Sequence, residues 1–353
     1  FSTVIGSFII PFILLVNILM LITRCTRTIN IDIWNYWHYA FSGATVYILT
    51  NNYICAFIAA AAHCCISLLI ADRTAKTMQE ALGVPGISIP QGFAVTSVPI
   101  FLALDKFYDL IHLPKGNAGG DDSQMTEKFG WLKTLSEPMF LGAIIGIILG
   151  AIARNDVKTC LTCGMAMAAL MYLLPRMVKI IMEGLLPISN QARDFMQKKF
   201  HGEEFYIGMD SAIMLGIPVT MQVALVLIPI TLLLSAILPY NQTLPVGDLA
   251  STAYFVAMAT PIHKNSFLRT LISGTIMMGI VLLLATYFAP LITNFAMTGA
   301  LEIPEGAVQV TALSAGSWFA WVFCLLAKFR LLGSAIIVAV VGALITACKK
   351  IAK

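Results

Sequence analysis

Long apolar runs separated by short polar stretches constrain this chain more than any other feature. The runs at residues 54–70, 212–238 and 271–288 approach or exceed the ~20 residues that a helix needs to cross a bilayer. The chain has 353 residues, is 59% hydrophobic and has a mean hydropathy of +0.86. A water-soluble chain of this length has no core large enough to bury so much apolar sequence. We therefore expect an all-α polytopic membrane protein.

Other apolar runs are too short to cross a membrane. Those at residues 40–49, 93–103 and 249–259 fall well below the span length, and glycine, proline or asparagine lies near their ends. Broken helices and re-entrant hairpins leave backbone polar groups open, which a membrane tolerates only where those groups line a cavity. The short runs therefore indicate a transporter.

A polar and aromatic stretch at residues 23–42 lies between two apolar runs. It contains Arg24, Arg27, Asp32, Asn35, Tyr36, Trp37, His38 and Tyr39. In a chain with only 11% charged residues, we interpret this stretch as one wall of a polar pocket for a small hydroxylated solute. An aromatic belt at the membrane interface is the alternative for His38 and the tryptophans. Asp72 and Arg73 are interpreted as a helix-end pair.

Residues 86–92 and 202–216 are expected to supply the other walls. The first loop carries Ser88 and Gln91, and the two prolines and three glycines at residues 83–92 forbid a continuous helix, although an ordinary aqueous turn would do the same. The second carries Asp210 and Ser211 inside an apolar stretch. An ionisable group at membrane depth is a functional candidate, since burying it unpaired costs several kcal/mol. The alternative for Asp210 is a helix N-cap, which is compatible with a polar site.

The remaining ionisable residues carry weaker signals. Glu137 precedes Pro138 at the start of a helix, where a cap is the simpler interpretation, and it is a second catalytic candidate. Asp248 and His263 flank a short apolar run as pocket or cap residues. The eight cysteines are scattered, and Cys160-x-x-Cys163 lacks a second pair, so no metal or cofactor is expected. A net charge of +4 without a basic tract excludes nucleic-acid binding.

Basic residues predict the orientation in the membrane. They favour the cytoplasmic side and follow the first apolar run, fill a polar break at residues 191–204 and close the chain. We therefore place the C-terminus and a loop at residues 193–199 inside, and the acidic residues 301–306 outside. Arg193, Lys198 and Lys199 are candidates for contact with a cytoplasmic partner.

Several motifs carry a resemblance to a known family. NIDIWNYWHYAFSG at residues 30–43 closely resembles the corresponding motif of galactitol-type enzyme IIC components of the bacterial phosphoenolpyruvate-dependent sugar phosphotransferase system, in the ascorbate–galactitol superfamily. Further matches follow in the same order: ISIPQG (87–92), PRMVKIIMEGLLPISNQAR (175–193), FHGEEFYIGMDSAIMLG (200–216), NQTLPVGDLA (241–250) and FLRTLISG (267–274). The likeness covers nearly the whole chain and is weakest after residue 301.

The resemblance implies an architecture. Such proteins are inner-membrane homodimers of about ten membrane segments, with a core domain that contains two re-entrant hairpins and a V-shaped scaffold domain. Here residues 1–75 would be mainly scaffold, residues 76–235 mainly core with hairpins near 83–95 and 202–216, and residues 236–353 mixed. The chain begins at Phe1, and we expect the family's first membrane segments to be missing.

The resemblance also implies roles. His38 corresponds to a sugar-contacting histidine, with Ser42 on the same helix face. Gln91 and Asp210 lie at the hairpin tips, and Asp210 corresponds to the carboxylate that activates the attacking hydroxyl. Asn35, Ser88 and Ser211 complete the expected binding set. The phosphoryl donor is a phosphocysteine of enzyme IIB, which works with IIA. Galactitol members carry histidine at Gln91 and a polar residue at Ile217, so the polyol stays open.

From the residues alone, an ion-coupled secondary transporter that releases unmodified sugar fits equally well. A third interpretation is an intramembrane enzyme without transport, but its usual marks, a His-Glu-x-x-His zinc motif or a Gly-x-Ser-x-Gly elbow, are absent from the sequence. The product inside the cell separates a phosphotransferase component, which yields sugar phosphate, from a secondary transporter, which yields free sugar.

Overall fold

The computed structural model describes residues 4–30, 32–115, 138–199, 204–245, 248–298 and 309–351, and most of these are helical. The α-helices are α1 (Val4–Ile22), α2 (Ile33–Thr50), α3 (Tyr53–Leu82), α4 (Gly92–Leu110), α7 (Pro138–Ile152), α8 (Val157–Lys199), α9 (Pro218–Ile237), α10 (Ser251–Val256), α11 (Ala259–Ile262), α12 (Phe267–Thr298), α13 (Trp318–Ala327) and α14 (Arg330–Ile351). Two short 3₁₀ helices, η1 (Ser211–Gly216) and η2 (Leu313–Ala315), complete the set.

Four of the described helices are long and apolar enough to cross a membrane. They are α3, α9, α12 and α14, with spans Tyr53–Leu82, Pro218–Ile237, Phe267–Met297 and Arg330–Lys349. Shorter apolar helices accompany them at Phe8–Ile22, Gly142–Ile152, Val157–Leu173 and Trp318–Ala327. The expected mostly helical, multi-pass membrane protein is confirmed.

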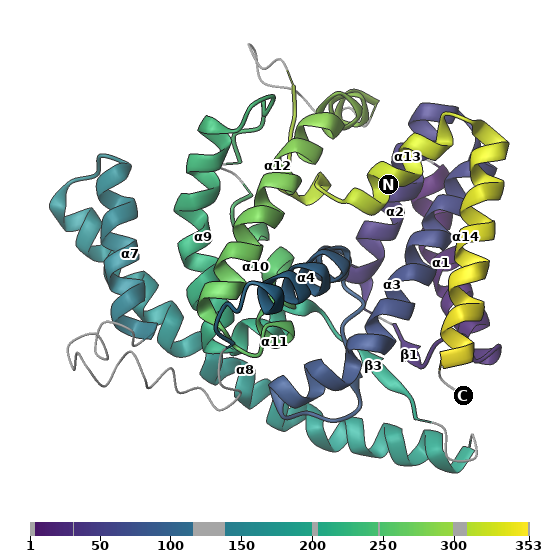
Figure 1. The fold of residues 1–353 in the computed structure, drawn as a ribbon, viewed down its shortest axis with the longest axis horizontal. Coiled ribbons are helices and arrows are strands. Elements are labelled where there is room, and N and C mark those ends of the chain that lie inside the picture. The colour runs from purple at the N-terminus through teal and green to yellow at the C-terminus, as the bar shows by residue number, and fades with distance from the viewer. Residues whose placement is uncertain are drawn as a thin grey trace.

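The helices pack into two main groups (Figure 1). Helices α1, α2, α3, α13 and α14 surround one apolar core, and α4, α9, α10 and α12 pack together beside it. Ala56, Ala59 and Ala60 on α3 are fully buried in the first group. Small residues let helix backbones approach closely, which is how helices associate where lipid removes the hydrophobic driving force.

Helix α8 differs from the sequence expectation. We expected a polar break at residues 191–204 and a loop at 193–199, but the helix continues to Lys199 and runs along one edge of the molecule (Figure 1). Residues 188–199 contain neither glycine nor proline, and glutamine, alanine, arginine, methionine and lysine favour helix. The charged residues at 193–199 therefore continue α8, and the expectation that they mark its end was wrong.

A small parallel sheet joins three distant segments. Strands β1 (Thr28–Ile29), β2 (Ile87–Ser88) and β3 (Tyr206–Gly208) form it, with β3 in the middle. The Tyr206 N–H donates to the Arg27 carbonyl at 2.8 Å, and the Met209 N–H donates to the Ser88 carbonyl at 2.8 Å. These bonds satisfy backbone groups that non-helical segments leave open. The sheet was not expected, because strands of two or three residues are too short to show alternation.

Candidate functional site

The three segments that the sequence analysis assigned to one pocket meet at the carboxyl end of this sheet. Each strand leads into the N-terminus of a helix. Asp32 caps α2 by accepting from the Trp34 N–H at 2.9 Å, Gln91 caps α4 through the Ala94 N–H at 3.0 Å, and Asp210 caps η1 through the Ala212 N–H at 2.6 Å. Asp210 is therefore an N-cap, and it also stands where three polar loop ends converge.

His38 and Gln91 contact each other directly. His38 lies on the second turn of α2, and its Nε2 is 3.3 Å from Nε2 of Gln91. The two side chains are 5% and 4% exposed. The Phe93 ring packs edge-on against the imidazole, with centroids 4.1 Å apart. His38 is thus a buried partner of the 86–92 loop, and a place in an exposed aromatic belt does not describe it.

The backbone at Gly92 approaches the His38 side chain so closely that only glycine fits. A Cβ at Gly92 would lie 2.2 Å from Cγ and 2.3 Å from Cβ of His38. Gly92→Ala should lower the free energy of unfolding by about 1–3 kcal/mol, as overpacking does in well-packed interiors. Thermal unfolding in detergent measures it. Gly279→Ala, on α12 with no neighbour within 4 Å of the new Cβ, is the control and should not destabilise.

A buried hydrogen-bond network supports the start of α2. Asn35 donates to Oδ1 of Asn30 at 2.9 Å, and the Tyr39 hydroxyl donates to the Pro90 carbonyl at 2.8 Å. Ser88 and Thr28 join hydroxyls at 2.8 Å, which links β2 to β1. Asn35 and Ser88 therefore hold the loop ends in place, while Oδ1 of Asn35 has no partner among the described residues.

Ser42 and Ser211 take different environments. Oγ of Ser42 lies 2.7 Å from Nδ1 of His63 on α3, so its hydroxyl is engaged on that side of α2. Ser211 is 0% exposed, and its hydroxyl has no hydrogen-bond partner in the described part of the chain. An orphaned buried hydroxyl next to Asp210 marks a place for a water or a ligand.

Asp72 is a residue that the sequence analysis misassigned. It lies inside α3, not at a helix end, and its carboxylate accepts from the Thr28 hydroxyl at 2.7 Å, the Thr26 hydroxyl at 2.9 Å and the Arg27 N–H at 3.0 Å. Asp72 therefore anchors β1. Its position after an apolar run was visible in the sequence, but its partners lie more than forty residues earlier.

Other expected site residues lie outside what the structure describes. Glu137 falls in the undescribed segment 116–137. The backbone of Arg193, Lys198 and Lys199 belongs to the last turns of α8, but their side chains are not described. Their roles stay predictions.

Comparison with known proteins decides the family. The model of the EIIC-GAT family, the sugar-specific permease component of the phosphotransferase system, matches residues 2–306. The chain belongs to this family. It is 43% identical over 350 residues to a putative permease IIC component of Escherichia coli K12, covering 99% of this chain and 79% of the relative. It is 38% identical over 314 residues to the galactitol-specific EIIC component of the same strain, covering 88% and 68%.

The permease is thus a membrane subunit that translocates sugar in a phosphotransferase system and works with IIA and IIB partners. The predicted family and function are confirmed at this level. The comparisons name no site residue, so the roles of His38, Gln91 and Asp210 stay predictions.

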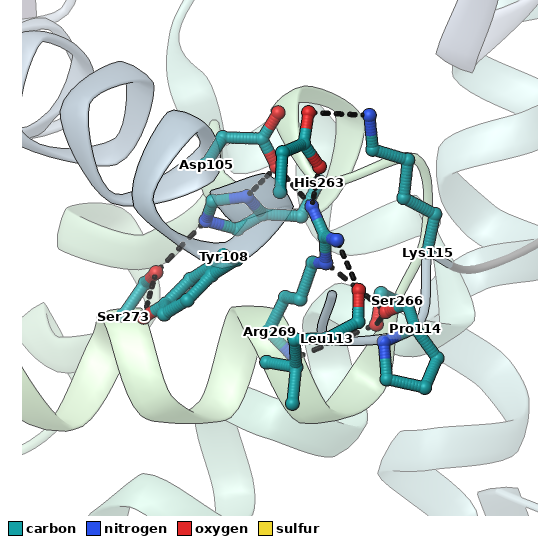
Figure 2. Close-up of polar contacts among 10 residues, drawn as sticks. Asp105, Tyr108, Leu113, Pro114, Lys115, His263, Ser266, Arg269 and Ser273 are labelled. Carbon is teal, nitrogen blue, oxygen red and sulfur yellow. Dashed lines mark hydrogen bonds and ion pairs between the residues drawn. The ribbon is translucent and has the colours of Figure 1, made fainter. Parts of the chain in front are cut away.

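The permease has a second polar cluster between α4 and the start of α12 (Figure 2). Arg269, 1% exposed, donates to Asp105 at 3.0 Å, to Asp109 at 2.8 Å and to the carbonyls of Leu113 and Pro114. The two carboxylates therefore balance the charge of Arg269, and its N–H groups have acceptors. The sequence analysis did not single out Arg269, although the motif at residues 267–274 contains it.

His263 extends this cluster. The sequence analysis left it as a pocket or cap residue, and its contacts show that it packs inside the cluster. Its Nδ1 lies 2.8 Å from Asp105 and its Nε2 lies 2.8 Å from the Ser273 hydroxyl, which also contacts Tyr108 at 3.0 Å. Burial lowers the pKa of His263, and Asp105 opposes that shift. The order Ser273–His263–Asp105 is that of a hydrolytic triad, but Ser273 and His263 are 0% exposed, so no substrate reaches them. Asp248, the other undecided residue, accepts from the Ser314 N–H at 2.9 Å and anchors that loop.

Proposed function

We propose that this permease imports galactitol or a related polyol and that the polyol is phosphorylated by a phosphocysteine of enzyme IIB during entry. The observation that carries the proposal is the meeting of three loop ends, capped by Asp32, Gln91 and Asp210, in a chain of this family. His38 on α2 contacts Gln91 at this place. The relative that is 38% identical is named as galactitol-specific, which supports a polyol as the substrate class. The family resemblance implies a histidine at the position of Gln91, which leaves the particular polyol open.

In the proposed reaction, Asp210 is the general base. A substrate hydroxyl oxygen attacks phosphorus, the P–S bond breaks, and the electron pair leaves on the cysteine thiolate of IIB. Asp210 takes the hydroxyl proton. Such a step depends on positioning and charge stabilisation, and the helix N-termini of α2 and α4 place positive ends beside the site. Burial raises the pKa of Asp210, which makes its carboxylate a better proton acceptor.

In the same proposal, His38 and Gln91 bind hydroxyls of the sugar. They bond each other in this structure, so a bound polyol would exchange that contact for bonds of its own. His38→Ala should weaken polyol binding by about 1–3 kcal/mol, because a buried polar partner is left unpaired. Equilibrium binding of labelled polyol to the purified permease measures it. Trp34→Ala, 71% exposed on the same helix, is the control and should bind as wild type.

We also propose the family architecture for this chain: about ten membrane segments, hairpins near 83–95 and 202–216, and a homodimer. The two helix groups support a division into scaffold and core, with α1–α3, α13 and α14 on one side and α4, α9, α10 and α12 on the other. The hydrogen bond from Lys349 to the Thr23 carbonyl, at 2.8 Å, places the chain's end beside the basic residues after α1 and supports a cytoplasmic C-terminus.

The test of the function is uptake of a panel of labelled polyols into cells with and without the phosphoenolpyruvate-dependent system. We expect accumulation of a polyol phosphate that stops when phosphoryl transfer is blocked. Accumulation of free polyol, driven by an ion gradient, would instead assign the chain to secondary transport.

A further inference from the structure

We propose that Asp32 is a positioning residue for sugar phosphorylation and acts on Asp210 through its negative charge across the carboxyl end of the sheet. This inference rests on the proposed function. Asp32 lies in the polar stretch that the sequence analysis assigned to a pocket wall, but neither the sequence nor the family resemblance gave it a role of its own. What brings it to the site is the register of the sheet.

The register places Asp32 and Asp210 at matching positions along the chain after the β1–β3 pair. In the β1–β3 pair, Thr28 is opposite Tyr206 and Ile29 is opposite Ile207. Asp32 and Asp210 each lie three residues after the second of these pairs, Ile29 and Ile207. The close pairing continues past the strand, because a Cβ on Gly208 would lie 3.1 Å from the Ile29 carbonyl oxygen and 3.2 Å from Cα of Asn30.

Each carboxylate is fixed by the same device. Asp32 and Asp210 both accept a hydrogen bond from the backbone N–H two residues later, so neither side chain is free to turn away from its loop end. Both residues are partly exposed, in contrast to the fully buried Ser211 beside Asp210. Two buried polar atoms next to them, Oγ of Ser211 and Oδ1 of Asn35, lack partners in the described structure. This edge therefore has polar groups available to a ligand.

The charges around Asp210 come from few elements. Burial is the main cause that raises the pKa of Asp210, the Ala212 N–H lowers it, and the Asp32 charge raises it by the smallest of the three contributions. Tyr254 on α10 senses Asp210 in return, since burial and then the Asp210 charge raise the pKa of its hydroxyl. Loop 86–92 and α9 contain no charged residue. The described charged side chains of α8, which packs against η1, are the exposed Lys158, Arg176 and Glu183. Helix α3, which contacts β3, carries Asp72, whose carboxylate is bound to β1. Asp32 is thus the carboxylate whose removal changes the field at Asp210 most directly.

The physical consequence concerns proton transfer. A like charge nearby disfavours ionisation and raises the pKa of a carboxyl group. A base with a higher pKa accepts the proton of an alcohol more readily, provided that it is still ionised at the working pH. Asp32 would therefore make Asp210 a stronger base without touching the reacting hydroxyl.

Asp32→Asn tests this inference, because asparagine caps helices as well as aspartate does and removes only the charge. The rate of polyol phosphorylation by phospho-IIB is measured against pH in the purified permease. In the wild type, activity falls at acid pH as Asp210 is protonated. We expect the variant's acid limb to move to lower pH and its rate at neutral pH to fall.

The control is Asp156→Asn. Asp156 also caps a helix, accepting from the Lys158 N–H at 3.1 Å, but it is exposed at the start of α8. The acid limb of the Asp156→Asn profile of rate against pH should coincide with that of the wild type. An unmoved limb in Asp32→Asn, or the same shift in both variants, overturns the inference. Absence of polyol phosphate from the wild type at every pH overturns the proposed function and the inference with it.

Discussion

Asp210→Asn is expected to lower the rate of coupled phosphorylation by about 100- to 10,000-fold, the range that a positioned general base contributes. The amide has nearly the shape of the carboxylate, and its oxygen can still accept the Ala212 N–H, so η1 should keep its cap. What is lost is the ability to take the hydroxyl proton. Single-turnover transfer from phospho-IIB to labelled polyol measures the rate.

Polyol binding to the same preparation is the internal control for Asp210→Asn. Binding should stay measurable, because His38 and Gln91 are untouched. A variant that phosphorylates at the wild-type rate would remove Asp210 from the chemistry. A variant that loses binding and phosphorylation together would make Asp210 a binding residue instead of a base.

Arg269→Met is expected to cause the largest loss of stability. It would leave Asp105 and Asp109 without their shared cation and the carbonyls of Leu113 and Pro114 without a donor. Asp105 and Asp109 are 21% and 43% exposed, and Asp109 keeps Lys115, so most of the expected loss comes from the carbonyls left without a donor, at about 1–3 kcal/mol each. Thermal unfolding in detergent, read from tryptophan fluorescence, measures the change.

Lys115→Gln is the matched control for Arg269→Met. Lys115 pairs with the same Asp109 at 2.6 Å, but both side chains are about two-fifths exposed, at 40% and 43%. Exposed ion pairs contribute roughly 0–1 kcal/mol. Equal losses in the two variants would show that the cluster in Figure 2 is not a buried anchor of α4 on α12.

The sequence predicted the helices that depend on long apolar runs, and α3, α9, α12 and α14 follow them. It also predicted that residues 23–42, 86–92 and 202–216 belong together, because polar residues at membrane depth need partners. The structure shows that a three-stranded sheet joins these segments, and its strands are too short to show alternation in the sequence. The sequence left undecided whether Asp210 is a helix cap or a pocket residue, and the geometry of Asp210 allows both roles.

What the sequence could not predict are contacts between distant residues. Arg269 lies more than 150 residues from Asp105 and Asp109, and Asp72 lies far from the β1 groups that it binds. Each looked ordinary in its own stretch. The end of α8 was missed for a different reason, since a run of charges on good helix formers continues a helix as readily as it ends one.

The most direct measurement is a structure of the permease with galactitol bound. We expect one hydroxyl within about 2.6–3.2 Å of the Asp210 carboxylate, with others bonded to His38 or Gln91 at the carboxyl end of the sheet. A polyol bound elsewhere, with lipid or packed helices between it and Asp210, would contradict the proposed site.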